Sequence, residues 1–163
     1  MRQFFAAARG GVAPEVIETE HRFEMQVGSA KVAGRLDRMD RTGPDSVTIV
    51  DYKTGKPKSQ EDADESLQLS LYALAVQETL GKRADRLIFH NLENNTPVCT
   101  TRTGGELETA RVRVQEVAAG IAEGQFAPKV GYHCRLCPYR NLCPATEKVV
   151  AAPQKKAARV HSS

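Results

Sequence analysis

The sequence has no long apolar run. No stretch approaches the about 20 apolar residues that a membrane-spanning helix needs. A short apolar patch near the N-terminus, residues 4–8, is interrupted by Arg9 too early for a secretory signal peptide. These absences predict a cytoplasmic protein.

A Gly-x4-Gly-Lys-Ser/Thr phosphate-binding loop is also absent from the sequence. Charge of one sign is not in large excess, because 23 Lys and Arg stand against 20 Asp and Glu, which gives a net charge of +3. So small an excess is weak evidence for a polyanionic partner. With 40% hydrophobic and 26% charged residues, the 163 residues suit one globular domain.

Cysteine is scarce and unevenly distributed. Three of the four cysteines, Cys134, Cys137 and Cys143, lie within ten residues, while Cys99 stands apart. In a chain without an export signal, such clustering favours metal or cluster ligands over disulfides. Thiolates three positions apart in a turn can bind the same metal or cluster.

The spacing of the apolar residues predicts an α/β protein. Alternation predicts strands at residues 16–27, 31–39, 47–52, 86–91 and 98–102. Helical spacing predicts helices at residues 66–80 and 106–123, each followed by a glycine that suits a helix end. The third strand is nearly all apolar or β-branched, so we expect it at the centre of the sheet with both faces covered. The order of the elements predicts a mixed sheet with helices packed on it.

Two carboxylates and a lysine fall on neighbouring strands. Asp51 and Lys53 are two residues apart and therefore point to the same face of their strand. If the turn at residues 42–45 pairs this strand with the preceding one, Asp37 comes close to Asp51. Two adjacent carboxylates repel each other, and a divalent cation such as Mg²⁺ or Mn²⁺ relieves the repulsion. The pattern predicts a metal site with oxygen ligands and with Lys53 beside it.

An Asp-x-Lys sequence at a strand end is common and, by itself, typical of a solvated strand terminus. Here it belongs to an ordered set, because Gln68 and Tyr72 follow on one face of the next helix. A metal at this site would polarise a phosphate and lower the pKa of bound water. Lys53 could then orient that water or stabilise the developing charge.

Three runs together resemble the RecB-type branch of the PD-(D/E)xK nuclease superfamily. They are residues 34–38 (Gly-Arg-Leu-Asp-Arg), 49–56 (Ile-Val-Asp-Tyr-Lys-Thr-Gly-Lys) and 68–72 (Gln-Leu-Ser-Leu-Tyr). The resemblance covers residues 16–147. It implies a restriction-endonuclease-like mixed sheet flanked by helices, and a metal-dependent DNA exonuclease that acts in repair or recombination.

The resemblance also implies a role for each residue of the set. Asp37 and Asp51 are metal ligands together with the Tyr52 carbonyl, Lys53 is the catalytic lysine, and Gln68 and Tyr72 line the site. Glu20 is the candidate for an acidic or histidine residue that the family often has upstream. Independently of the resemblance, Lys56 and Lys58 are candidate DNA contacts, because positive charge beside a metal site suits a phosphate backbone.

The cysteine segment resembles the Cys-x2-Cys-x5-Cys end of many such nucleases, which holds a 4Fe–4S cluster with a fourth cysteine far upstream. This sequence departs from that pattern, because no cysteine precedes Cys99. The favoured explanation is a fragment, or a short gene product, that lacks the upstream region. The alternatives are Cys99 or His133 as the fourth ligand, and zinc in place of the cluster.

The expected organisation has three parts: a flexible or truncated N-terminal segment (1–15), the nuclease domain (16–147, with its cysteine-rich part at 126–147) and a disordered basic tail (148–163). Domains that this sequence resembles commonly follow a superfamily 1 helicase motor, so the resemblance implies such a motor. Because the phosphate-binding loop is absent, we expect the motor on a missing part of the chain or on a partner. A stand-alone exonuclease is the other option within the family. Two further hypotheses stay open. One is an inactive relative that binds DNA or scaffolds a helicase. The other is a zinc or iron–sulfur interaction module whose strand motif is coincidental.

Overall fold

The computed structural model describes residues 14–145, and the predictions for residues 1–13 and 146–163 lie outside the described residues. The chain divides into two units, residues 1–119 and 120–163, and each is described by itself.

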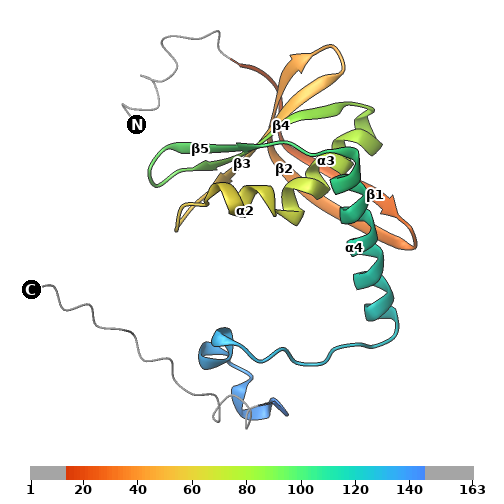
Figure 1. Cartoon of the computed structure of the whole chain (residues 1–163), viewed down its shortest axis with the longest axis vertical. Helices are drawn as coiled ribbons and strands as arrows, with labels where there is room; N and C mark the ends of the chain where they lie inside the picture. The colour runs from red at the N-terminus through yellow and green to blue at the C-terminus, as the bar shows by residue number, and fades with distance from the viewer. Residues whose placement is uncertain (1–13, 146–163) are drawn as a thin grey trace, which may run out of the picture. The chain divides into compact units, whose positions relative to one another are not determined.

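The first unit is built on a five-stranded sheet in the order β1-β2-β3-β4-β5 (Figure 1). Neighbouring strands are antiparallel except for β3 and β4, which run parallel. The strands are β1 (Glu15–Val27), β2 (Ala30–Gly43), β3 (Ser46–Lys53), β4 (Arg83–Asn91) and β5 (Thr96–Thr100). The predicted mixed sheet is therefore confirmed.

The central strand is β3, as the sequence predicts. Each residue from Val47 to Asp51 is buried, so both faces of the strand are covered. Four of these five residues are apolar or β-branched, and the exception, Asp51, is only 3% exposed. A carboxylate at this depth is costly unless it has partners, so the groups around the end of β3 decide how Asp51 is accommodated.

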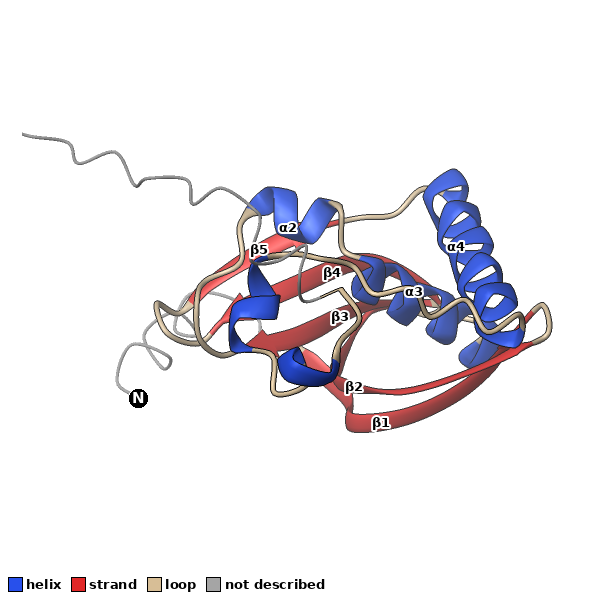
Figure 2. Cartoon of the chain, turned by 90° about the horizontal axis from the view of Figure 1, so that it is seen from below, coloured by secondary structure: helices blue, strands red, loops and turns tan. Residues whose placement is uncertain are grey.

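The parallel connection from β3 to β4 passes through α2 (Gln60–Asp64) and α3 (Leu67–Leu80). The Ser66 side chain begins α3 by accepting the N–H of Leu69, and Gly81 ends it in the left-handed conformation, with φ at 63°. Helix α3 lies along one face of the sheet (Figure 2) and carries the buried Leu69 and Leu74 into the core. The predicted helix and its glycine cap are confirmed.

The chain after β4 differs slightly from the prediction. β5 ends at Thr100, two residues earlier than expected, because the Arg102 side chain turns to the backbone of α2 and α3. Helix α4 (Gly104–Ala122) follows, and Leu107, Ala110 and Val114 pack against the core. None of the helices in residues 14–145 is long and apolar enough to cross a membrane.

The second unit holds the cysteine segment. After the end of α4, its regular structure among the described residues is two 3₁₀ turns, η1 (Tyr132–Leu136) and η2 (Arg140–Leu142). Cys134 lies within η1, and Cys137 and Cys143 follow the two turns directly. The segment buries little apolar surface, since most of its large apolar side chains are more than two thirds exposed.

Candidate active site

The two predicted carboxylates meet across the β2–β3 pair. Arg38 lies opposite Val50 in the antiparallel register, which brings Asp37 beside Asp51. The Asp37 Oδ2 atom accepts a hydrogen bond from the backbone N–H of Tyr52 at 2.9 Å. This contact fixes the Asp37 side chain next to the strand position that carries Asp51.

The Asp51 carboxylate has an unequal set of partners. Its Oδ1 accepts from Gln68 Nε2 at 3.0 Å and from the Tyr72 hydroxyl at 3.4 Å. Its Oδ2 is 2.8 Å from the Lys53 ammonium, in an ion pair. Among the described residues no other donor reaches that oxygen. A buried carboxylate oxygen whose one partner is a cationic side chain is a position that a metal ion can also occupy.

Burial raises the pKa of Asp51 above its ordinary value. The Lys53 ammonium opposes this effect, and the negative charge of Asp37 adds to it. Burial also raises the pKa of Tyr72, which stays a neutral hydrogen-bond donor at neutral pH. Two carboxylates in a poorly solvated site have the electrostatics that a bound cation would relieve.

Lys53 is held by groups from three elements. Its ammonium donates to Gln68 Oε1 at 2.7 Å on α3 and lies 4.7 Å from the centre of the Phe89 ring on β4. With Asp51 on β3, these contacts keep the lysine at the sheet end. Gln68 is the link between the two charged residues, because its carbonyl accepts from Lys53 while its amide donates to Asp51.

The Tyr72 side chain is held in position by contacts with Gln68 on its own helix and with Phe23 on β1. Its hydroxyl accepts from Gln68 Nε2 at 2.7 Å, as expected for residues one helical turn apart. Its ring meets the edge of Phe23 at 6.1 Å, and a Cβ at Gly34 would come within 2.6 Å of that phenylalanine ring. The glycine that opens the Gly-Arg-Leu-Asp run is therefore required by packing beneath the site.

The opposite face of the sheet carries a second network that the sequence reasoning missed. Arg38 donates two hydrogen bonds to Asp40 and one, from Nη1, to the Tyr52 hydroxyl at 3.2 Å. Because side chains alternate, Arg38 and Tyr52 lie behind Asp37 and Asp51. The hydrogen bond from Arg38 to Tyr52 joins β2 to β3 at the level of the two carboxylates. The alternation of side chains along the two strands could have indicated this pair from the sequence.

The model of the PD-(D/E)XK nuclease superfamily matches residues 1–144. The chain belongs to this superfamily. Among solved structures it is similar to the protein SSO0001, with 19% identity over 89% of this chain and 66% of the other and a TM-score of 0.48. A protein of Eubacterium rectale, provisionally named an exonuclease, is 14% identical over 95% of this chain and 57% of the other, with a TM-score of 0.47. The chain thus spans less than two thirds of the length of either protein. No curated protein sequence shows significant similarity to it.

Membership of the superfamily accounts for the restriction-endonuclease-like sheet and places the chain among nucleases. Within residues 14–145, no three His, Cys, Asp or Glu side chains gather closely enough to hold a metal ion. Glu20, on β1, accordingly does not join Asp37 and Asp51 in such a group. Its carboxylate pairs instead with Arg35 at 2.6 Å and its side chain is 57% exposed. Glu20 also has a positive φ of 55°, which the strand alternation gave no sign of.

The cysteines of this nuclease-superfamily chain fall in different units. Cys99 lies on β5 in the first unit, where its sulfur accepts from Arg86 Nε at 3.4 Å. Cys134 lies in the second unit, where its sulfur accepts the N–H of Gly131 at 3.4 Å. His133 Nε2 lies 3.1 Å from the Lys129 carbonyl oxygen. The fourth ligand therefore stays a prediction.

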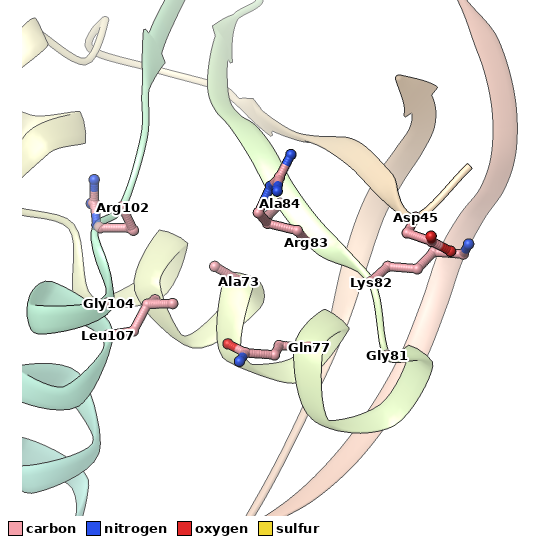
Figure 3. A pocket seen from close by; sticks show the side chains of 10 residues that line it. All are labelled: Asp45, Ala73, Gln77, Gly81, Lys82, Arg83, Ala84, Arg102, Gly104 and Leu107. Atoms are coloured by element: carbon pink, nitrogen blue, oxygen red, sulfur yellow. The ribbon is translucent and has the colours of Figure 1, made fainter. Parts of the chain in front are cut away.

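A cavity of about 470 Å³ lies between the end of α3, the start of β4 and the start of α4 (Figure 3). Its polar lining comes from Asp45, Gln77, Lys82, Arg83 and Arg102. It contains neither carboxylate of the site nor Lys53. We therefore place the candidate active site at the middle of β2 and the end of β3, outside this cavity.

Proposed function

We propose that this chain is a metal-dependent deoxyribonuclease of the RecB-like branch, which degrades DNA from its ends with Asp37, Asp51 and Lys53. One observation carries the proposal. Asp51 is buried beside a second carboxylate, and among the described residues its Oδ2 atom has no partner other than the Lys53 ammonium at 2.8 Å. A domain with a structural role alone has no need of this costly arrangement.

The donor set fits a hard divalent cation. Asp37, Asp51 and the Tyr52 carbonyl would offer oxygen ligands only, which suits Mg²⁺ or Mn²⁺. Magnesium usually keeps several waters and takes one or two carboxylates, so two protein carboxylates are enough. Such an ion would supply Lewis-acid polarisation of the scissile phosphate and a lowered pKa for bound water.

The residues of the chain have separate tasks in this proposal. Lys53 stabilises the negative charge that develops on the phosphoryl oxygens and orients the attacking water. Gln68 keeps Lys53 in place, since its carbonyl accepts from the ammonium at 2.7 Å. Its amide and the Tyr72 hydroxyl keep the Asp51 carboxylate in a fixed orientation.

Cleavage assays on linear DNA with wild type and Lys53→Ala test this function. In Mg²⁺ or Mn²⁺ the wild type should degrade end-labelled DNA, EDTA should stop it, and the variant should lose roughly 10²- to 10³-fold in kcat, as for loss of one charge-stabilising donor. Lys31→Ala, at an exposed position near the start of β2, removes the same charge outside the site and should retain full activity.

Three outcomes separate the hypotheses. DNA binding without cleavage by the wild type would support the inactive DNA-binding or scaffold module. Equal cleavage by wild type and Lys53→Ala would remove Lys53 from the mechanism. If the wild type neither binds nor cleaves DNA, the hypothesis that remains is the zinc or iron–sulfur interaction module.

The wider setting of the proposed function follows from the resemblance to RecB-type nucleases. We propose that the domain acts in DNA repair or recombination with a superfamily 1 helicase motor, in cis or in trans. The cysteine segment, with Cys134, Cys137 and Cys143, is proposed to hold a 4Fe–4S cluster, with zinc as the alternative. These proposals are independent of the cleavage chemistry and need their own test.

A further inference from the structure

The loop that leaves the candidate active site is fastened by a buried asparagine. Asn91, the last residue of β4, is 1% exposed. Its Oδ1 accepts the backbone N–H of Lys58 at 2.7 Å, and its Nδ2 donates to the Lys58 carbonyl at 3.1 Å. The side-chain amide thus pairs with both backbone polar groups of one loop residue, as a neighbouring strand would.

Both ends of this loop, residues 54–58, are fixed to the same point of the sheet. Asn91 is the register partner of Lys53, and the next residue, Leu92, donates its N–H to the Lys53 carbonyl at 2.9 Å. After Lys58 the chain enters α2 directly, with Ser59 as its N-cap in a capping box with Asp62. The loop is therefore a short bridge between the lysine of the site and a capped helix.

The loop presents two lysines to solvent. Lys56 and Lys58 are exposed, and within residues 14–145 neither comes within ion-pairing distance of a carboxylate. Their charges contribute, after the larger effect of the Ser59 hydrogen bonds, to a lowered pKa of Asp62. Gly55 gives the loop its turn, with φ at 82° and open space around it.

We infer that the loop at residues 54–58 is a contact surface for the phosphate backbone of nucleic acid, and that Asn91 is the positioning residue that sets it beside Lys53. The inference rests on the proposed function and names a further part of the same site. Lysines act as point charges on phosphates without reading bases, so the contact is independent of sequence. A loop held in place beforehand loses less freedom on binding than a free one.

The inference is tested by the salt dependence of cleavage with an end-labelled single-stranded oligonucleotide in Mg²⁺. Each lost phosphate contact flattens the slope of log(kcat/KM) against log[salt] by roughly 0.7. Between roughly 50 and 200 mM salt, kcat/KM of such a variant should therefore fall about threefold less than that of the wild type. The double variant Lys56→Ala/Lys58→Ala should raise KM, leave kcat unchanged and flatten the slope. Asn91→Leu, which keeps both lysines, should also raise KM and flatten the slope, but by less than the double variant.

Two comparisons distinguish positioning from mere support of the fold. Adding Asn91→Leu to the double lysine variant should cause no further flattening, because the lysines that it positions are gone. Lys31→Ala should keep the wild-type slope. A loss of stability alone does not change a salt slope, so a folded Asn91→Leu protein with the wild-type slope overturns the role of Asn91.

The remaining outcomes concern the loop and the reaction itself. If the double lysine variant retains the wild-type slope, the loop makes no backbone contact and the inference fails, even where Asn91→Leu does not fold. If the wild type cleaves DNA and only the loop results fail, the proposed function stands. If the wild type does not cleave DNA, the proposed function fails first and the inference with it.

Discussion

At the scale of the residue, Asp51 combines an unfavourable burial with the proposed role of a metal ligand. It lies on the most buried strand, next to a second carboxylate, and one of its oxygens has only the Lys53 ammonium as a partner among the described residues. Binding sites often retain such groups at the expense of stability, because the function needs the charge in place.

Asp51→Asn should therefore stabilise the metal-free protein while abolishing cleavage. Burial raises the pKa of Asp51, so the folded state binds its proton more tightly than the unfolded chain and stability falls as pH rises above the ordinary carboxyl pKa. The neutral amide has no such penalty. Thermal unfolding in EDTA at pH 7 should show a higher midpoint for the variant, and the difference should shrink toward acid pH, where the carboxyl of the wild type is protonated.

Addition of Mg²⁺ reverses the comparison, because a ligand that binds the folded state raises its stability by mass action. The wild type should gain in unfolding midpoint and the variant should not. If the variant is less stable than the wild type in EDTA, the stabilisation from the Lys53 ion pair is larger than the cost of burying the Asp51 carboxylate, and the prediction is wrong.

At the scale of the element, α3 depends on an arginine outside it. Arg102 uses all five of its N–H donors: on the carbonyls of Ala63, Ser66 and Thr101, and on the hydroxyls of Ser70 and Thr100. These groups belong to α2, to the start of α3 and to the chain after β4. The guanidinium thereby fixes the helix start that presents Gln68 to Lys53.

Arg102→Ala should lower the free energy of unfolding by about 3 kcal/mol, since it leaves several partly buried carbonyls and hydroxyls without their donor. Arg102→Lys keeps the charge but cannot reproduce five fixed donors, so it should recover only part of the loss. Urea unfolding of both variants measures the effect. Wild-type stability in Arg102→Ala would mean that water replaces the guanidinium at no cost.

The sequence predicts the elements well where one strong local pattern acts. The apolar run at residues 47–52 indicated a central strand, and the helix at residues 66–80 was marked by its apolar face and by Gly81. The end of β5 was misplaced, because Arg102 leaves the strand to reach two helices distant in sequence. A contact of that range has no signature in local spacing.

The same limit applies to the site. The convergence of Asp37 and Asp51 follows from a tight turn, and the pairing of Gln68 with Tyr72 follows from one helical turn, so both could be predicted. Phe89 and Asn91 were missed, since their place beside Lys53 depends on the parallel register of β4 with β3. That register is set by packing across a long crossover, and no residue pattern indicates it.

At the scale of the whole molecule, the chain combines a sheet that carries the candidate active site with a cysteine segment that has little core of its own. Tyr132, Leu136 and Leu142 are each more than three quarters exposed. A segment with so little buried apolar surface gains its stability from a bound metal or cluster where one is present.

Absorption spectra and metal analysis of the protein purified without oxygen test this account. A 4Fe–4S cluster should give a brown protein with visible charge-transfer absorbance, lost in Cys134→Ala and Cys137→Ala. Zinc should instead give a colourless protein with a stoichiometric metal content. Removal of either metal should lower the unfolding midpoint, and a protein with neither metal nor a response to chelators would leave the cysteines without a ligand role.

The central claim is that Asp37 and Asp51 hold a divalent cation beside Lys53. A crystal of the protein grown with Mn²⁺ and an anomalous difference map test it most directly. The account predicts a peak at roughly 2.1 to 2.2 Å from oxygens of both carboxylates, with the Lys53 ammonium displaced from Asp51 Oδ2. Well-ordered density at both carboxylates without a peak between them, under Mn²⁺ conditions that support DNA cleavage, would contradict it.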